Sequence, residues 1–136
     1  TGKAIFSIAD VPFYSLAKDE FMMMTIRSHD QFNTTIYSLN DRYRGVFNER
    51  RIILMNEHDI EREGLQSGDV VDLYNYYDDI ERIARRFIVV PYKIQERCTA
   101  TYFPEANVLV PINSVAEKSN TPTSKMVIVK IKKHSE

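Results

Sequence analysis

Short apolar stretches bounded by turn-forming residues recur along the chain and predict a mainly β protein. Each stretch is rich in β-branched, aromatic or Met residues, which favour strands. The last stretch begins with apolar residues on both faces and ends in alternation, so we expect it to run from the core toward solvent. The predicted strands are Ala4–Ile8, Phe21–Arg27, Arg51–Met55, Val70–Tyr74, Ile80–Val90 and Met126–Lys132, with a hairpin tip at Asn75–Asp79.

One short helix is predicted between the third and fourth strands. Asn56 is suited to cap its first turn, with Asp59 three residues later as the partner in a capping-box-like arrangement. Glu57 and Asp59 also suit the positive end of the helix dipole. Gly64 supplies the left-handed residue that ends the helix, and Ser67-Gly68-Asp69 then turns into the next strand.

Two long polar loops make up most of the remainder, Ser28–Asn48 and Ala106–Ser124. Long loops without secondary structure in a compact domain are usually either functional or disordered. The aromatic residues of the first loop argue against disorder there; they are Phe32, Tyr37, Tyr43 and Phe47. The two polar loops are therefore able to bind another molecule.

Composition narrows the classes of protein that fit. The chain has 136 residues, the size of one domain, and its formal net charge of −1 does not indicate a nucleic acid or an anionic membrane as partner. Cys98 is the single cysteine, so no internal disulfide is possible, and no apolar run is long enough to span a bilayer. We expect one cytoplasmic domain over residues 1–136. Because a predicted strand follows Thr1-Gly2-Lys3 at once, we also expect a fragment of a larger chain.

Charge is unevenly distributed despite the small total. Residues 57–81 carry nine acidic side chains and one basic one, whereas residues 27–51 carry five arginines and three acidic side chains. An arginine-rich loop with interleaved aromatic residues suits a phosphorylated ligand that contains rings. A solvated loop that a few rings anchor would show the same pattern, and composition alone favours this second interpretation without excluding the first.

No self-contained active site is visible. Ser28-His29-Asp30 has the residue types of a hydrolase triad, but consecutive side chains diverge and cannot line up for the reaction. His29, His58, His134 and Cys98 lack the spacing of metal ligands, and a glycine-rich phosphate loop is missing. We therefore predict no catalytic residues and no metal site in this chain.

The stretch Met24-Thr25-Ile26-Arg27-Ser28-His29-Asp30-Gln31-Phe32-Asn33-Thr34 resembles the first loop of the molybdopterin dinucleotide-binding domain. It is most similar to the branch of formate dehydrogenase α-subunit-like oxidoreductases. The resemblance extends over nearly the whole chain from Phe21 on, in the family's order, except that Ser38 stands where the branch often has Gly. Its further blocks are Asp41–Gly45, Met55–Val71, Tyr102–Pro111 and Ser119–Lys125.

The resemblance implies a six-stranded double-psi β-barrel with one or two short helices, at the C-terminal end of a larger oxidoreductase. Such a domain clasps molybdopterin guanine dinucleotide with molybdenum, in the bis form, against the remaining domains of the same polypeptide. The molybdenum ligand and any iron–sulfur cluster belong to those other domains, so this domain is not expected to be catalytic alone.

Two alternatives are a non-catalytic double-psi barrel that serves as a binding or adaptor module, and an unrelated β-domain that binds RNA. The near-neutral charge counts against RNA.

The resemblance also implies which side chains meet the cofactor. Arg27 can fork onto phosphate or pterin acceptors, and the amide of Asn107 suits a pterin ring. Arg42 and Arg44 could instead pack against the rest of the enzyme. For each candidate the alternative is a side chain that caps its own loop. The predicted cofactor-binding residues are Thr25, Arg27, Ser28, His29, Thr34, Asn107, Ser119 and Lys125.

Overall fold

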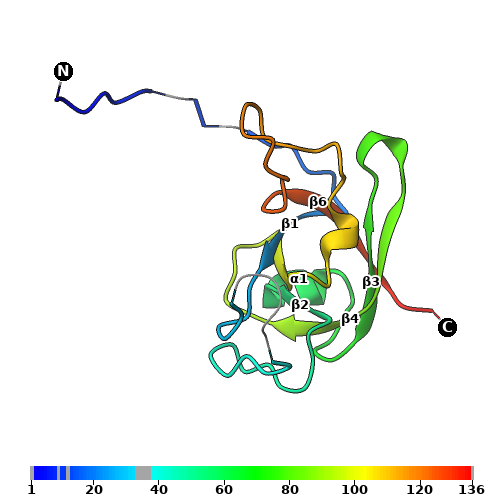
Figure 1. Ribbon diagram of the computed structural model, residues 1–136. Coiled ribbons are helices and arrows are strands. Elements are labelled where there is room, and N and C mark those ends of the chain that lie inside the picture. The colour runs from blue at the N-terminus through cyan, green and yellow to red at the C-terminus, as the bar shows by residue number, and fades with distance from the viewer. Residues whose placement is uncertain (1, 9, 12, 33–37, 136) are drawn as a thin grey trace.

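The computed structural model describes residues 2–8, 10–11, 13–32 and 38–135. Within these residues six strands close into a barrel in the order β1-β5-β2-β4-β3-β6, and β6 pairs back onto β1 (Figure 1). The β1–β5 and β2–β4 pairings are parallel and the other four are antiparallel, so the sheet is mixed. The strands are β1 (Glu20–Ile26), β2 (Ile52–Met55), β3 (Val70–Asn75), β4 (Arg82–Pro91), β5 (Cys98–Tyr102) and β6 (Val127–Lys133). The expected mainly β, six-stranded barrel is confirmed.

Alternate positions of the strands fill the barrel. Every second residue of a strand points to the same face, so residues two apart share the interior. The inward set, each at most 3% exposed, is Phe21, Met23, Ile53, Met55, Val71, Leu73, Phe87, Val89, Val127 and Val129. A second cluster joins Ile52, Leu54, Ala100 and Tyr102 to Val46. Val46 belongs to the first polar loop, so that loop packs against the outer face of β2 and β5.

The predicted short helix is present as α1 (Glu57–Arg62), and its two ends are as expected. Asn56 caps it, since its Oδ1 accepts a hydrogen bond from the backbone N–H of His58 at 2.9 Å. Gly64 ends it with a φ of +66°, in the left-handed region. The predicted capping-box role of Asp59 is wrong. Its buried carboxylate accepts from the backbone N–H of Arg97 at 2.6 Å, because the β4–β5 connection lies against the helix.

The structure contradicts one strand prediction and contains one strand that the sequence did not predict. Ala4–Ile8 forms no strand; Ile5 and Phe6 are 91% and 90% exposed in an extended arm that runs away from the barrel (Figure 1). The reason is that a closed barrel has no free edge with which a further strand could pair. The strand that was not predicted is β5, whose sequence Cys-Thr-Ala-Thr-Tyr is short and shows no clear apolar alternation. Cys98, at its start, is half-buried.

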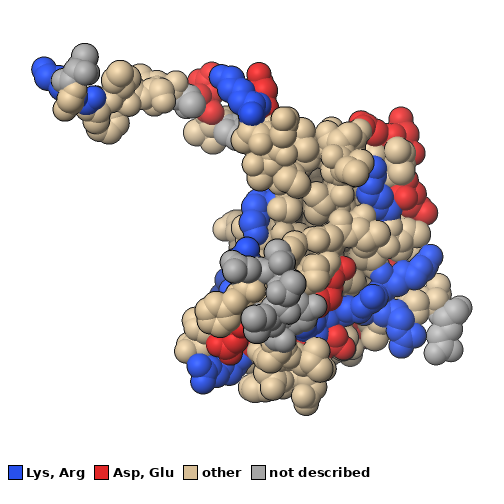
Figure 2. All heavy atoms as spheres, viewed as in Figure 1, with Lys and Arg blue, Asp and Glu red and all other residues tan. Residues whose placement is uncertain are grey.

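The hairpin between β3 and β4 has the predicted tip, a 3-10 turn at Tyr77–Asp79. Asp78, Asp79 and Glu81 are exposed there, and Figure 2 shows acidic side chains gathered around this tip at the upper right. The burial of β6 decreases along its length, as its sequence predicted. In the described part of the chain, no helix has the length and apolar character needed to cross a bilayer.

Candidate functional site

The barrel topology brings three predicted cofactor-binding segments to one end. Because β1 and β5 are parallel neighbours, with Ile26 beside Tyr102, the chain leaves both strands side by side. Because β6 is antiparallel to β1, with Val127 beside Met23, β6 begins at this same end. We call the result the loop rim; it comprises residues 25–31, 103–107 and 124–125.

Two hydrogen bonds join the end of β1 to the segment that leads into β6. The N–H of Thr25 donates to the carbonyl oxygen of Ser124 at 2.9 Å. The ammonium group of Lys125 donates to the carbonyl oxygen of Thr25. Thr25 is 1% exposed, so its hydroxyl lies within the barrel wall, while Lys125 is exposed. Of these two predicted residues, Lys125 is the one presented at the surface of the rim.

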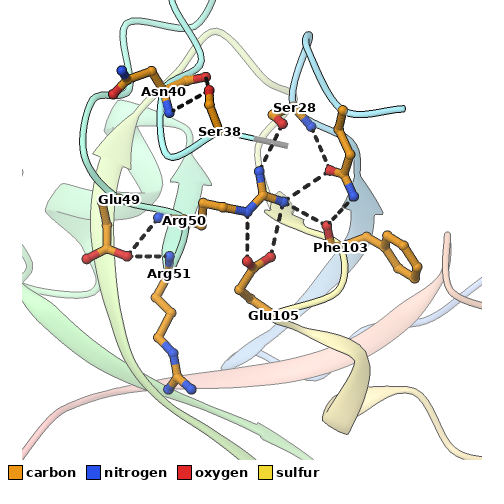
Figure 3. Close-up of polar contacts among 9 residues, drawn as sticks. Ser28, Ser38, Asn40, Glu49, Arg50, Arg51, Phe103 and Glu105 are labelled. Carbon is orange, nitrogen blue, oxygen red and sulfur yellow. Dashed lines mark hydrogen bonds and ion pairs between the residues drawn. The ribbon is translucent and has the colours of Figure 1, made fainter. Parts of the chain in front are cut away.

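A buried arginine lies at the centre of the rim (Figure 3). Arg50, 3% exposed, directs its Nε and Nη2 to the two carboxylate oxygens of Glu105, at 2.7 and 3.2 Å. Its Nη1 donates to Ser28 Oγ at 2.9 Å. Its Nη2 also donates to Gln31 Oε1 at 3.0 Å and to the carbonyl oxygen of Phe103 at 2.8 Å. One guanidinium group thus contacts both the loop after β1 and the loop after β5.

Residues 28–31 form a compact turn on this arginine. The N–H of Ser28 donates to Gln31 Oε1 at 3.2 Å, and the N–H of Gln31 donates to the carbonyl oxygen of Ser28 at 3.1 Å. The Gln31 side-chain amide donates to the Phe103 carbonyl oxygen at 2.9 Å. Ser28 and Gln31 are buried, whereas His29 and Asp30 between them are exposed. The turn therefore presents His29 outward and uses Ser28 as an anchor.

A second buried carboxylate secures the first polar loop. Asp41 Oδ2 accepts from Arg44 Nη1 at 2.5 Å, from the hydroxyl of Tyr102 at 2.9 Å and from the N–H of His29 at 3.3 Å. Burial alone would raise the pKa of Asp41, but the hydrogen bonds from Arg44 and Tyr102 outweigh it, so the pKa is lowered below 3.8. Asp41 Oδ1 is buried without a hydrogen-bond partner among the residues that the structure describes.

The five arginines of residues 27–51 lie in different environments. Arg44 pairs with Asp41 and Arg50 with Glu105, while Arg51 donates to the carbonyl oxygen of Arg85 at 2.9 Å. For these three the structure supports the interpretation of a loop anchored from within, and Arg44 has a partner inside the domain. Arg42 lies over the exposed ring of Tyr43, 5.0 Å from its centroid. Arg27 is exposed at the end of β1.

The remaining predicted residues are less closely grouped. The ring centroids of His29 and Tyr43 lie 3.6 Å apart, and Asn107 is exposed at the start of the 3-10 turn Asn107–Leu109. Ser119 is exposed in a turn where its Oγ accepts from the N–H of Thr121 at 3.4 Å. In Figure 1 the orange segment that contains this turn lies beside the N-terminal arm, far from the cyan loop 38–48. Thr34 lies outside the described residues.

The exposed groups of the rim suit a ligand with phosphates and polar ring edges. Arg27 and Lys125 are cationic, Asn107 offers an amide, and His29 offers a ring that lies against the ring of Tyr43. Across the described residues, no group of three or more His, Cys, Asp or Glu side chains could hold a metal ion.

The sequence alone indicated no such role for Arg50, Glu105 or Asp41. Arg50 was one of the arginines of residues 27–51 that suit a ligand, and Glu105 was part of a block that resembles the family. Arg50 and Glu105 are 55 residues apart, and Asp41 and Tyr102 are 61 apart. No local sequence pattern predicts contacts between residues so far apart in the chain, because only the strand order brings them together.

The structure is a closed mixed barrel with cationic and amide side chains exposed at one rim, an arrangement that suits a cofactor-binding domain. The family model described as "Molydopterin dinucleotide binding domain" matches residues 21–131, and the chain belongs to this family. An uncharacterized oxidoreductase of Mycobacterium tuberculosis (strain ATCC 25618 / H37Rv) is 45% identical over 136 residues, which cover 96% of this chain and 18% of the relative. Protein YdeP of Escherichia coli (strain K12) is 36% identical over 120 residues, which cover 86% of this chain and 16% of the relative. The chain thus spans less than a fifth of the length of these relatives.

Proposed function

We propose that this chain is the molybdopterin guanine dinucleotide-binding domain of a formate dehydrogenase-like molybdenum oxidoreductase. Membership of the family supports binding of the dinucleotide, and the name of the mycobacterial relative supports an oxidoreductase. The observation that carries the proposal is the convergence of three loops at the rim, where Arg27, His29, Asn107 and Lys125 are exposed.

In this proposal each exposed side chain contacts a different part of the dinucleotide. Arg27 leaves the barrel at the end of a strand and presents a planar fork that matches phosphate oxygens or a pterin carbonyl. Lys125 adds a second cation, and the Asn107 amide can donate and accept along a pterin edge. Ser28 acts by holding its turn, so that His29 faces the ligand. Thr25, Thr34 and Ser119 are included through the resemblance alone, since Thr25 is buried in the barrel wall and Ser119 lies outside the loop rim.

The bound group would supply the molybdenum redox chemistry, and the residues of this domain bind and orient it. In this proposal the remaining domains of a longer, cytoplasmic polypeptide form the opposite wall of the site and carry the molybdenum ligand and any iron–sulfur cluster. The short length of the chain relative to its relatives supports such a division.

Analysis of the purified full-length protein tests the proposal. Molybdenum content, the fluorescent oxidation product of the pterin, and guanine nucleotide released by mild acid hydrolysis should all be found together. The bis form predicts paired guanine nucleotides for each molybdenum atom. The 136-residue chain alone should not oxidise formate with a dye acceptor. Full-length protein that contains neither pterin nor molybdenum, when made in cells that synthesise the cofactor, would instead favour a non-catalytic binding module.

A further inference from the structure

The guanidinium of Arg50 joins three segments that are distant in sequence. Arg50 lies just before β2, which is antiparallel to β5, so it reaches the end of β5 where the loop rim begins. From there it contacts Ser28 in the loop after β1 and Glu105 in the loop after β5 (Figure 3). Its guanidinium carbon also lies over the Tyr102 ring, 4.9 Å from the centroid.

We propose that Arg50 is a positioning residue that sets the shape of the rim before the cofactor binds. The inference rests on the proposed function, because the ligand in question is the molybdopterin dinucleotide. Arg50 is buried and is not offered to the ligand itself. It acts through the turn at residues 28–31, which carries His29 and directly follows Arg27.

The geometry requires a guanidinium group. Arg50 donates from Nε and Nη2 to the Glu105 carboxylate and from Nη1 to Ser28 Oγ. Its Nη2 also donates to the Phe103 carbonyl oxygen and to Gln31 Oε1. A lysine ammonium is a point charge with three donors, and it cannot reproduce a planar fork at these angles. A charge that is 3% exposed also requires its counter-ion, and Glu105, with a side chain 16% exposed, supplies it.

The carbonyl oxygen of Phe103 accepts two hydrogen bonds that connect the two loops. Phe103 accepts from Arg50 Nη2 and from the amide of Gln31, so the turn after β1 is fastened to the segment after β5. That segment leads directly into Asn107. A rim held in this way loses less conformational freedom when the ligand binds, which strengthens binding without adding any contact to the ligand.

Arg50→Lys in the full-length protein tests the inference. The variant should hold about tenfold less pterin per folded molecule at limiting cofactor, as expected when a charge-assisted contact that organises the site is lost. In cofactor-free protein, from cells unable to make the pterin, hydrogen exchange should accelerate at residues 28–31 and 103–107. Exchange at residues 127–131 should stay unchanged, because β6 takes no part in the network.

Two further variants keep the test decisive. Arg51→Lys is the matched control: it changes the neighbouring, exposed arginine, and it should leave pterin content and exchange at the rim unchanged. Glu105→Gln removes the counter-ion at nearly constant size and should lower pterin content in the same direction, even if Arg50→Lys does not fold. Wild-type protein that holds no pterin overturns the proposed function. Wild-type protein that holds pterin, with unchanged content per folded molecule in both rim variants, overturns the inference about Arg50 alone.

Discussion

The hydroxyl of Tyr102 donates a hydrogen bond to Asp41 Oδ2 at 2.9 Å, and each residue is only 1% exposed. Tyr102 ends β5, while Asp41 lies in the first polar loop, so this contact fastens the loop to the barrel. Burial raises the pKa of the Tyr102 hydroxyl, and its hydrogen bond to Asp41 raises it further, so the hydroxyl remains a donor. The folding of the long loop therefore depends on a side chain of the barrel wall.

Tyr102→Phe should lower the free energy of unfolding by about 1.5–3 kcal/mol, the range for a hydrogen bond to a charged partner. Asp41 would keep its contacts with Arg44 and the N–H of His29, so the loop should loosen without unfolding the barrel. Denaturant titration of the 136-residue chain measures the loss. Tyr43→Phe, which changes an exposed tyrosine of the same loop, should alter stability by less than about 0.5 kcal/mol. Equal effects of the two substitutions would contradict the importance of the buried contact.

Acid should destabilise the chain through two buried carboxylates. For Asp72, as for Asp41, burial alone would raise the pKa, but hydrogen bonds outweigh it and hold the pKa below 3.8; for Asp72 the first of these comes from the N–H of Arg86. A folded pKa below the unfolded value contributes stability that is fully present above the unfolded pKa. This stability is lost as the pH falls through the folded pKa. The free energy of unfolding should thus decline as the pH is lowered from about 4.

Denaturant titrations across that pH range measure this decline. Asp41→Asn and Asp72→Asn should each show a shallower decline than the wild type, because each lacks one of the responsible carboxylates. Asn40→Ala, which alters the first loop without removing a charge, should keep the wild-type slope. A slope in Asp41→Asn as steep as that of the wild type would show that Asp41 does not contribute.

Arg27→Lys in the full-length protein should reduce cofactor content. The loss should correspond to one charge-assisted hydrogen bond, about 1.5–3 kcal/mol, because an ammonium group cannot form the bidentate contact. The thermal midpoint of the 136-residue chain should hardly change, since Arg27 is exposed and adds little to the core. Comparison of pterin content per folded molecule with the thermal midpoint separates the two roles. A fall in the midpoint with unchanged pterin content would make Arg27 structural.

Gly64→Ala should destabilise the chain by about 1–2 kcal/mol, because a φ of +66° places a Cβ close to the following carbonyl oxygen. Beyond Gly64 and its chain neighbours, no atom of the described residues lies within 4 Å of the position of that Cβ, so the cost arises in the local backbone and not from a clash with packed side chains. Thermal unfolding provides the measurement. The control is Gln66→Ala, an exposed position in the same connection, which should be close to neutral.

Several features of the protein were readable from the sequence because they depend on neighbouring residues. The cap at Asn56, the left-handed residue Gly64 and the acidic hairpin tip at Asp78 and Asp79 are local, and the structure has all of them. Five of the six predicted strands were also found, since β-branched and aromatic runs favour strands wherever they pair. The family-like blocks identified the family and the loops, without specifying how those loops meet.

Tertiary structure decided which strands pair and which polar side chains contact one another. Ala4–Ile8 has the composition of a strand, yet it forms none because the closed barrel leaves no edge to pair with. Cys98–Tyr102 has a weaker strand pattern but forms a strand of the barrel, because β1 pairs with it on one side and β2 on the other. From the sequence, Arg50 was expected either to face a ligand or to be solvated. It is instead buried against Glu105, 55 residues away in the chain. The sequence by itself determined elements, caps and family. Which polar side chains became internal anchors, and which stayed free for a ligand, depended on strand order, because only strand order sets the distance between residues so far apart in the chain.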